Sequence, residues 1–171
     1  MKIATLIKTT FVVIGREGST ENGAGFVQRL WADANGHFDE VADLAKKDES
    51  GNLVGIWGAM TDFSRSFRPW ESGFSKGLYL AGVECQDEAP APDGWTKWVI
   101  PGFEYLQAEC DEPDIFQKML ALLEEKQFSL AGAVQDFTDP GTGKTICCFL
   151  SAGCDRERMK AQQLDYKNYQ M

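Results

Sequence analysis

The chain has 171 residues, of which 43% are apolar, 12% aromatic and 25% charged. This length and composition suit one globular domain, or two small fused modules, and exclude an intrinsically disordered chain. Asp and Glu outnumber Lys and Arg by 26 to 17, and the resulting net charge of −9 would repel a phosphate backbone, so no direct nucleic-acid partner is expected.

The first half of the chain predicts a strand, a long helix and two further strands. A β-rich run at residues 9–14 ends at Gly15 and predicts the first strand. Apolar residues recur at three- and four-residue steps from Phe26 to Ala45, which predicts one helix over about residues 24–46. Strands are expected at residues 53–60 and 77–85, joined by a long connection.

The second half predicts the same order of elements after an acidic, proline-rich linker at residues 86–94. The predicted strands are interrupted by a kink at Pro101-Gly102, and the predicted helix opens with Asp111 as its N-cap and ends at Lys126. The strand ranges of this half are 95–100, 103–110, 131–138 and 145–151.

This repeated order predicts a duplicated strand–helix–strand–strand unit. The best internal match pairs residues 53–57 with residues 130–134, because both strands enter through a Leu-x-Gly step. We predict repeat one at about residues 8–86 and repeat two at about 95–153. Residues 154–171 are polar and form a tail, which is either a frayed or disordered segment or a docking element for a partner.

The cysteines and the single histidine predict neither a metal site nor a disulfide framework. No CxxC pair is present and His37 lies inside the first predicted helix, so no metal, cofactor or His-based catalytic system is expected. The cysteines are interpreted as small buried apolar side chains in a protein that resides in a reducing compartment. They are Cys85, Cys110, Cys147, Cys148 and Cys154.

Two glycine-containing segments imitate phosphate-binding motifs without meeting their requirements. Residues 139–145 lack the first glycine of a phosphate-binding loop and enter a strand, so they predict a hairpin turn. Gly23 and Gly25 have Gln28 where a dinucleotide fingerprint needs its third glycine. The longest apolar run, residues 11–14, is far below the roughly 20 residues that cross a bilayer, and with no signal peptide we predict a soluble, cytoplasmic protein.

The connection at residues 60–74 carries four large aromatic side chains, where a plain loop would carry none. Such rings either cap an open end of the core or form the wall of a ligand pocket. An acidic pocket lined by rings suits a cationic, partly hydrophobic molecule, and the nearby carboxylates are Glu71, Glu84, Glu104 and Asp136. The predicted pocket residues are Trp57, Met60, Phe63, Trp70, Tyr79, Trp98 and Tyr105.

Four segments, at residues 51–64, 79–84, 95–105 and 130–140, resemble a known family. It is the gyrase-inhibitory-protein-like (GyrI-like) small-molecule-binding domain, also found as the effector-binding domain of bacterial transcription activators. The resemblance implies an α+β fold of the SHS2 type: a tandem strand–helix–strand–strand duplication that forms one antiparallel sheet, with two helices packed on it and a central ligand cleft. It covers about residues 8–153 and implies one effector-binding domain over residues 1–153.

The same resemblance implies a site residue on the strand at residues 133–137. In the family an acidic residue precedes an aromatic one by two places, and the matching positions here are Gln135 and Phe137. An amide carries no charge, and Asp136 cannot replace it because adjacent strand residues point to opposite faces. A preference for cations would then depend on Glu84 or Glu104.

Three classes of function remain open. The favoured one is a stand-alone module that binds hydrophobic or aromatic, in part cationic, small molecules, as in multidrug or effector sensing. The second, implied by hydrolases in the family that open cyclopropane rings of natural products, needs Glu84 or Glu104 as the catalytic carboxylate. The third is an interaction protein whose partner is gyrase or a regulator. No helix-turn-helix segment is predicted, and the oligomeric state is left open.

Overall fold

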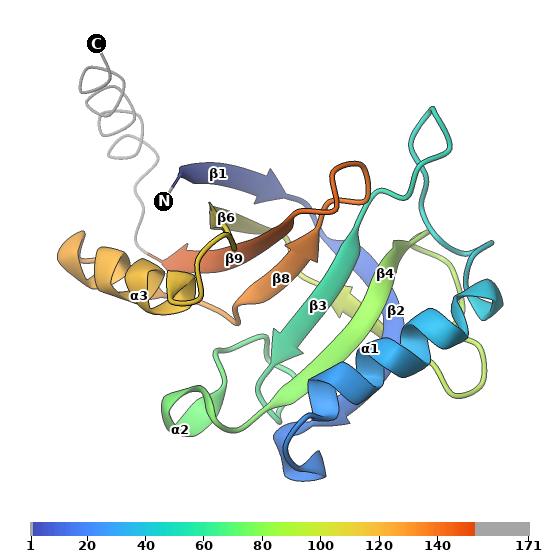
Figure 1. The fold of residues 1–171 in the computed structure, drawn as a ribbon, viewed down its shortest axis with the longest axis horizontal. Helices are drawn as coiled ribbons and strands as arrows, with labels where there is room; N and C mark the ends of the chain where they lie inside the picture. The colour runs from blue at the N-terminus through green and yellow to red at the C-terminus, as the bar shows by residue number, and fades with distance from the viewer. Residues whose placement is uncertain (1, 153–171) are drawn as a thin grey trace.

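A computed structural model describes residues 2–152, which form one twisted antiparallel sheet with helices on one of its faces (Figure 1). Eight strands follow the order β1-β6-β9-β8-β3-β4-β2-β5, and the short β7 pairs with β9. The elements are β1 (Ile3–Lys8), β2 (Phe11–Ser19), the 3₁₀ turn Thr20–Asn22, α1 (Phe26–Gly36), the 3₁₀ turn Phe38–Glu40, β3 (Ile56–Thr61), α2 (Glu71–Phe74), β4 (Leu78–Cys85), β5 (Thr96–Ile100), β6 (Phe103–Glu109), α3 (Ile115–Glu125), β7 (Ser129–Leu130), β8 (Gln135–Thr138) and β9 (Thr145–Ala152).

The halves of the sheet are joined where β1 bends into β2 and where β5 bends into β6. β1 continues into β2 but pairs with β6, while β5 continues into β6 but pairs with β2. The two bends touch, because a Cβ atom on Gly102 would lie 3.1 Å from the backbone nitrogen of Thr10. Each half therefore contributes one strand to the other half. The predicted α+β fold, a strand–helix–strand–strand duplication with one antiparallel sheet, is confirmed.

The helices α1 and α3 lie on the same face of the sheet, which we call the helix face (Figure 1). The apolar side of α1 packs on β2 and β4, and that of α3 packs on β6 and β9. Between them, β3 and β8 carry no long helix (Figure 1). We call the opposite side of the sheet the far face. Its core includes Phe11, Val13, Trp57, Leu80, Trp98, Ile100 and Tyr105.

Several predicted boundaries are wrong, each for a local reason. The first helix ends at Gly36, because glycine costs helical stability and His37 has a non-helical φ of −124°. The second helix begins after Asp114, not Asp111. The strand at Ile3–Lys8 was not predicted, and the predicted strand 131–138 is reduced to β8. The hairpin turn at 139–143 is confirmed, since β8 and β9 pair on either side of it.

The expectation that no disulfide forms is wrong for Cys110 and Cys147, which are bonded to each other. They are 37 residues apart in sequence, but Cys147 pairs with Ala108 across the β6–β9 ladder and Cys110 points to the same face two residues later. Their Cα atoms are 6.3 Å apart, within the usual range for a disulfide. Cys85 and Cys148 are free and buried, as predicted.

The remaining predictions concern the chain as a whole. The division into repeats at 8–86 and 95–153 stays a prediction, and the polar tail 154–171, with Cys154, lies outside the described residues. No helix within residues 2–152 has the length and apolar character needed to span a membrane. The described part of the chain also contains no cluster of three or more His, Cys, Asp or Glu side chains that could hold a metal ion.

Candidate functional site

The candidate site follows β3 on the helix face, between α1 and α3. Alternation along a strand puts Ile56, Gly58 and Met60 on this face, at intervals of about 6.6 Å. We call these three positions the β3 strip. A cavity lies beside each end of the strip, since Ile56 lines one cavity and Met60 lines the other. The middle of the strip is the glycine.

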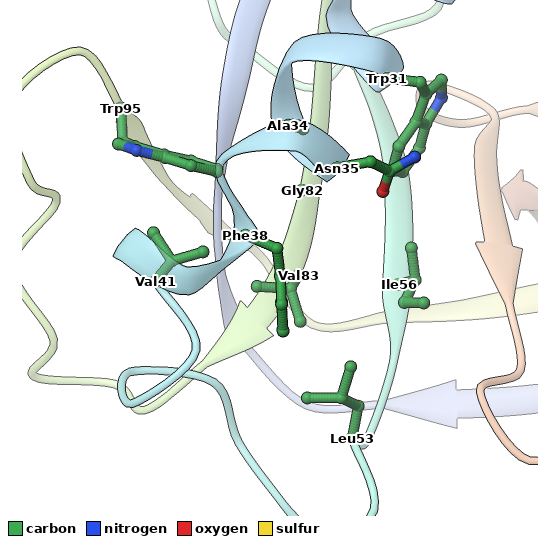
Figure 2. Close-up of a pocket in the computed structure, with 10 residues that line it drawn as sticks. All are labelled: Trp31, Ala34, Asn35, Phe38, Val41, Leu53, Ile56, Gly82, Val83 and Trp95. Carbon is green, nitrogen blue, oxygen red and sulfur yellow. The ribbon is translucent and has the colours of Figure 1, made fainter.

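The first cavity, of about 290 Å³, lies under the C-terminal half of α1 (Figure 2). It forms because α1 presents an apolar side to the sheet and ends at Gly36, so that the chain turns back and Val41 and Leu53 close the space. Its only side chains with hydrogen-bonding groups are Asn35, Trp31 and Trp95. The complete lining is Trp31, Ala34, Asn35, Phe38, Val41, Leu53, Ile56, Gly82, Val83 and Trp95.

A cluster of polar contacts holds the Trp95 wall of this cavity in place. The indole N–H of Trp95 donates to Glu40 at 2.7 Å, and the guanidinium of Arg16 lies 4.2 Å from the ring centre of Trp95. Arg16 also donates to the carbonyl of Gly94 at 2.6 Å and pairs with Asp33 on α1 at 2.8 Å. The wall is therefore tied to α1 and to the linker.

The second cavity, of about 210 Å³, lies at the other end of the strip and is covered by the aromatic connection. Trp70 is held by a hydrogen bond from its indole N–H to the carbonyl of Leu78 at 3.0 Å. Phe74 of α2 meets Phe116 of α3 edge to face, with ring centres 5.3 Å apart. The connection thus places rings against this cavity, whose lining is Met60, Trp70, Phe74, Phe116 and Val134.

A polar group of three residues lies at the middle of the strip. Asp136 is the partner of Gly58 in the β3–β8 ladder and shares the helix face with it. The Tyr79 hydroxyl lies over Gly58, where a Cβ atom would collide with it and would lie 3.2 Å from the Cβ of Asp136. The indole N–H of Trp31 on α1 donates to this hydroxyl at 3.1 Å. Only glycine leaves room for this arrangement.

Within residues 2–152, no cationic side chain forms an ion pair with the carboxylate of Asp136. Burial raises its pKa from the ordinary 3.8 to about 6, and within residues 2–152 it makes no hydrogen bond or ion pair. Burial also raises the pKa of Tyr79, and the nearby charge of Asp136 raises it further, so this phenol keeps its proton. At neutral pH the site therefore presents an uncompensated negative charge between two apolar cavities.

The predicted pocket residues are divided between the two faces of the sheet. Met60, Trp70 and Tyr79 lie on the helix face, Met60 within the β3 strip and the two rings beside it. Phe63 is an exposed loop residue, with 37% of its surface accessible. The remaining predicted rings pack in the core of the far face; they are Trp57, Trp98, Tyr105 and Phe137. Trp98 also lines a smaller cavity of about 150 Å³ on that side, together with Thr61, Arg65 and Phe67.

The predicted position Gln135 has a structural role. Its side chain is fully buried on the far face. The Oε1 atom accepts from the backbone N–H of Met60 at 2.8 Å, and Nε2 donates to the carbonyl of Met60 at 3.1 Å. These bonds satisfy the edge of β3 beyond Gly58, where its pairing with β8 ends.

The two candidate carboxylates lie away from both cavities. Glu84 is buried on the far face, where Lys8 approaches its Oε2 atom at 2.9 Å and the Trp57 indole donates to the same oxygen at 3.2 Å. Glu104 is a half-buried residue of β6 opposite Ile7, with no hydrogen bond or ion pair to the described residues.

Sequence reasoning missed Trp31, Phe38, Phe116 and the role of Asp136. It placed Gln135 and Asp136 on opposite faces, as the structure does, but it assigned the site to the face of Gln135. The helical aromatics have the spacing of ordinary core residues, so no local signal distinguishes them. The available signal was Gly58, because a glycine within a buried strand indicates a close approach by another group.

Comparison with known proteins supports the fold. No protein-family model matches the chain, and no curated protein sequence matches it. SAV2435 bound to tetraphenylphosphonium is 17% identical, with a TM-score of 0.56 over 91% of this chain and 97% of that one. The EcmrR C-terminal domain is 8% identical, with a TM-score of 0.57 over 88% and 96%. EcmrR in a complex with DNA is also 8% identical, with a TM-score of 0.59, and this chain spans only 57% of it. The predicted GyrI-like fold is confirmed.

Proposed function

We propose that the chain binds hydrophobic small molecules that carry aromatic groups and a positive charge, along the β3 strip. The observation that carries this proposal is the position of Asp136 between two apolar cavities, where its carboxylate has no ion-pair partner among the described residues. SAV2435, which shares the fold, has been solved with tetraphenylphosphonium, a cation with four phenyl groups.

Both parts of such a ligand find a matching environment. Apolar groups that enter either cavity leave water, which contributes about 25 cal/mol for each Å² of apolar surface removed. The positive centre meets the Asp136 carboxylate at the middle of the strip, and the rings of Trp31 and Tyr79 nearby attract a cation through their faces. The charge and the apolar surface are therefore recognised together.

Isothermal titration calorimetry with tetraphenylphosphonium tests this function. We expect saturable binding to the wild-type chain and at least about tenfold weaker binding to Asp136→Asn, because a paired charge in a partly desolvated site contributes more than about 1.4 kcal/mol. Glu104→Gln is the matched control, since it removes the same charge on a distant strand and should leave the affinity unchanged. Absence of binding to the wild-type chain, or equal affinity for wild type and Asp136→Asn, would refute the proposal.

The geometry favours a binding module over a hydrolase. A catalytic carboxylate must reach a water molecule and the substrate. The Oε2 atom of Glu84 is already engaged by Lys8 and Trp57, and this buried side chain lies on the far face, away from both cavities. We therefore propose no hydrolytic activity for this carboxylate.

A further inference from the structure

The middle of the β3 strip offers a hydrogen-bond acceptor and a hydrogen-bond donor side by side. We infer that the site prefers protonated amines, which carry an N–H group, to quaternary cations of the same size and shape. This inference rests on the proposed function and specifies the class of cation that the site takes.

The acceptor is the carboxylate of Asp136. It makes no hydrogen bond or ion pair to residues 2–152, although β3 and β9 flank it on both sides. Its ladder neighbours on the helix face are Gly58, which has no side chain, and Cys147, which is bonded to Cys110. Neither neighbour can donate a side-chain hydrogen bond. As far as the described part of the chain goes, both carboxylate oxygens therefore remain available to a ligand.

The donor is the hydroxyl of Tyr79. This oxygen accepts the indole N–H of Trp31, but its own O–H makes no hydrogen bond within the described residues. Because Trp31 fixes the oxygen from one side and Gly58 lies beneath it, the O–H is free to turn toward Asp136 or toward an acceptor on the ligand. A ligand that binds both groups would leave no polar group of this centre unpaired.

A quaternary cation cannot use this arrangement. Its charge is covered by methyl or aryl groups, so it satisfies the carboxylate by charge alone and makes no hydrogen bond. A protonated amine donates a charge-assisted hydrogen bond, which is about twice as strong as a neutral one. The surroundings are apolar and partly closed to water, so a hydrogen bond left unmade is costly.

The test compares two ligands that differ in a single methyl group: imipramine, a tricyclic tertiary amine, and its N-methylated quaternary derivative. Titration calorimetry of the full chain at pH 7.5 keeps both ligands cationic and Asp136 ionised. We expect imipramine to bind the wild-type chain about tenfold more tightly. The ratio should fall to about one in Asp136→Asn and in Asp136→Ser, and it should keep its wild-type value in Glu104→Gln.

The outcomes separate this inference from the proposed function. If both ligands bind with equal affinity, or if the quaternary derivative binds more tightly, the inference is wrong while the binding function stands. A preference for imipramine that persists in both Asp136 variants also overturns the assignment to this carboxylate. If neither ligand binds and tetraphenylphosphonium also fails to bind, the proposed function itself is wrong. Circular dichroism of each variant verifies that it is folded.

Discussion

The side-chain amide of Gln135 forms a closed pair of hydrogen bonds with the backbone of Met60. Oε1 accepts from the Met60 N–H at 2.8 Å and Nε2 donates to the Met60 carbonyl at 3.1 Å, as another strand would. A third contact joins Nε2 to the carbonyl of Ala133 at 3.4 Å. One buried side chain thus replaces a stretch of strand pairing at the end of the β3 strip. This role requires both the donor and the acceptor of an amide.

The exchange of this amide for a carboxylate is therefore expected to destabilise the fold. In Gln135→Glu an ionised side chain cannot donate to Met60 or Ala133, and it buries a charge without a partner. We predict a loss of about 2–4 kcal/mol in the free energy of unfolding at pH 7, measured by urea denaturation. Gln117→Glu, on the exposed side of α3, is the control and should change stability by less than about 0.5 kcal/mol. Equal effects of the two substitutions would contradict the role assigned to Gln135.

Asp136 predicts a pH dependence of stability. Burial raises its pKa in the folded state to about 6, above the ordinary 3.8, so the folded chain binds this proton more tightly than the unfolded chain. Its contribution to stability is complete below pH 4 and is lost as the pH rises through about 6. Relative to Asp136→Asn, the wild-type chain should lose about 2 kcal/mol between pH 4 and pH 7.5. Denaturation curves of both proteins at these two pH values measure the difference, and parallel behaviour would show that the carboxylate titrates normally.

The affinity for a cation should also depend on the ionisation of Asp136, but it should rise with pH where the stability falls. A cation favours the ionised form of Asp136, so the affinity for tetraphenylphosphonium is expected to rise as the pH increases through about 6 and to level off above it. Below pH 6 the affinity should fall toward that of Asp136→Asn, a total change of about tenfold. Titrations from pH 5 to pH 8 measure this profile. In Asp136→Asn it should be flat, and an unchanged slope in that variant would place the responsible group elsewhere.

Asp62 organises the connection that covers the second cavity. Its buried carboxylate accepts from the backbone N–H groups of Ser66 at 2.9 Å and Arg68 at 3.1 Å, and from the hydroxyls of Thr61 and Ser64. Burial by itself would raise the pKa of Asp62, but these hydrogen bonds outweigh it and lower the pKa to about 2. Its stabilising contribution is therefore present above pH 4 and lost as the pH falls through about 2.

Substitution of Asp62 should disorder this connection. Asp62→Ala leaves several partly buried donors without their acceptor and is expected to cost about 2–4 kcal/mol in the free energy of unfolding. Hydrogen exchange should speed up at the amides of Ser66 and Arg68, as measured by mass spectrometry of the corresponding peptides. Asp139→Ala, in the exposed β8–β9 turn, removes a carboxylate with similar turn bonds and should leave exchange in residues 62–68 unchanged. Protection retained in Asp62→Ala would show that another contact holds the loop.

Gly58 should be indispensable to the site. A methyl group at this position collides with the Tyr79 hydroxyl, so Gly58→Ala must displace Tyr79 and break its bond to Trp31. We expect a loss of about 1–3 kcal/mol in stability and at least tenfold weaker binding of tetraphenylphosphonium. Gly36→Ala at the end of α1 has no atom within 4 Å of the new methyl group and should be neutral or stabilising by up to about 1 kcal/mol. Unaltered binding by Gly58→Ala would show that the arrangement of Tyr79 over Gly58 does not contribute to ligand binding.

Local patterns in the sequence were sufficient to predict most elements of the fold. The strand at Leu78–Cys85, the kink at Pro101-Gly102 and the turn between β8 and β9 all depend on neighbouring residues, and each was recognised. Strand alternation also separated Gln135 from Asp136 correctly, because successive side chains of a strand point to opposite faces. These features depend on backbone geometry that is the same in every protein.

Only the tertiary structure determines which face of the sheet carries the candidate site. Alternation assigns residues to faces, but it does not show which face the helices and the aromatic connection will cover. Trp57 packs in the far-face core, whereas Trp70 lies beside a cavity on the helix face. The exchange of β1 and β5 between the halves, the disulfide across 37 residues and the meeting of Trp31, Tyr79 and Asp136 all join distant segments. Such contacts depend on the packing of the whole chain, and no short stretch of sequence encodes them.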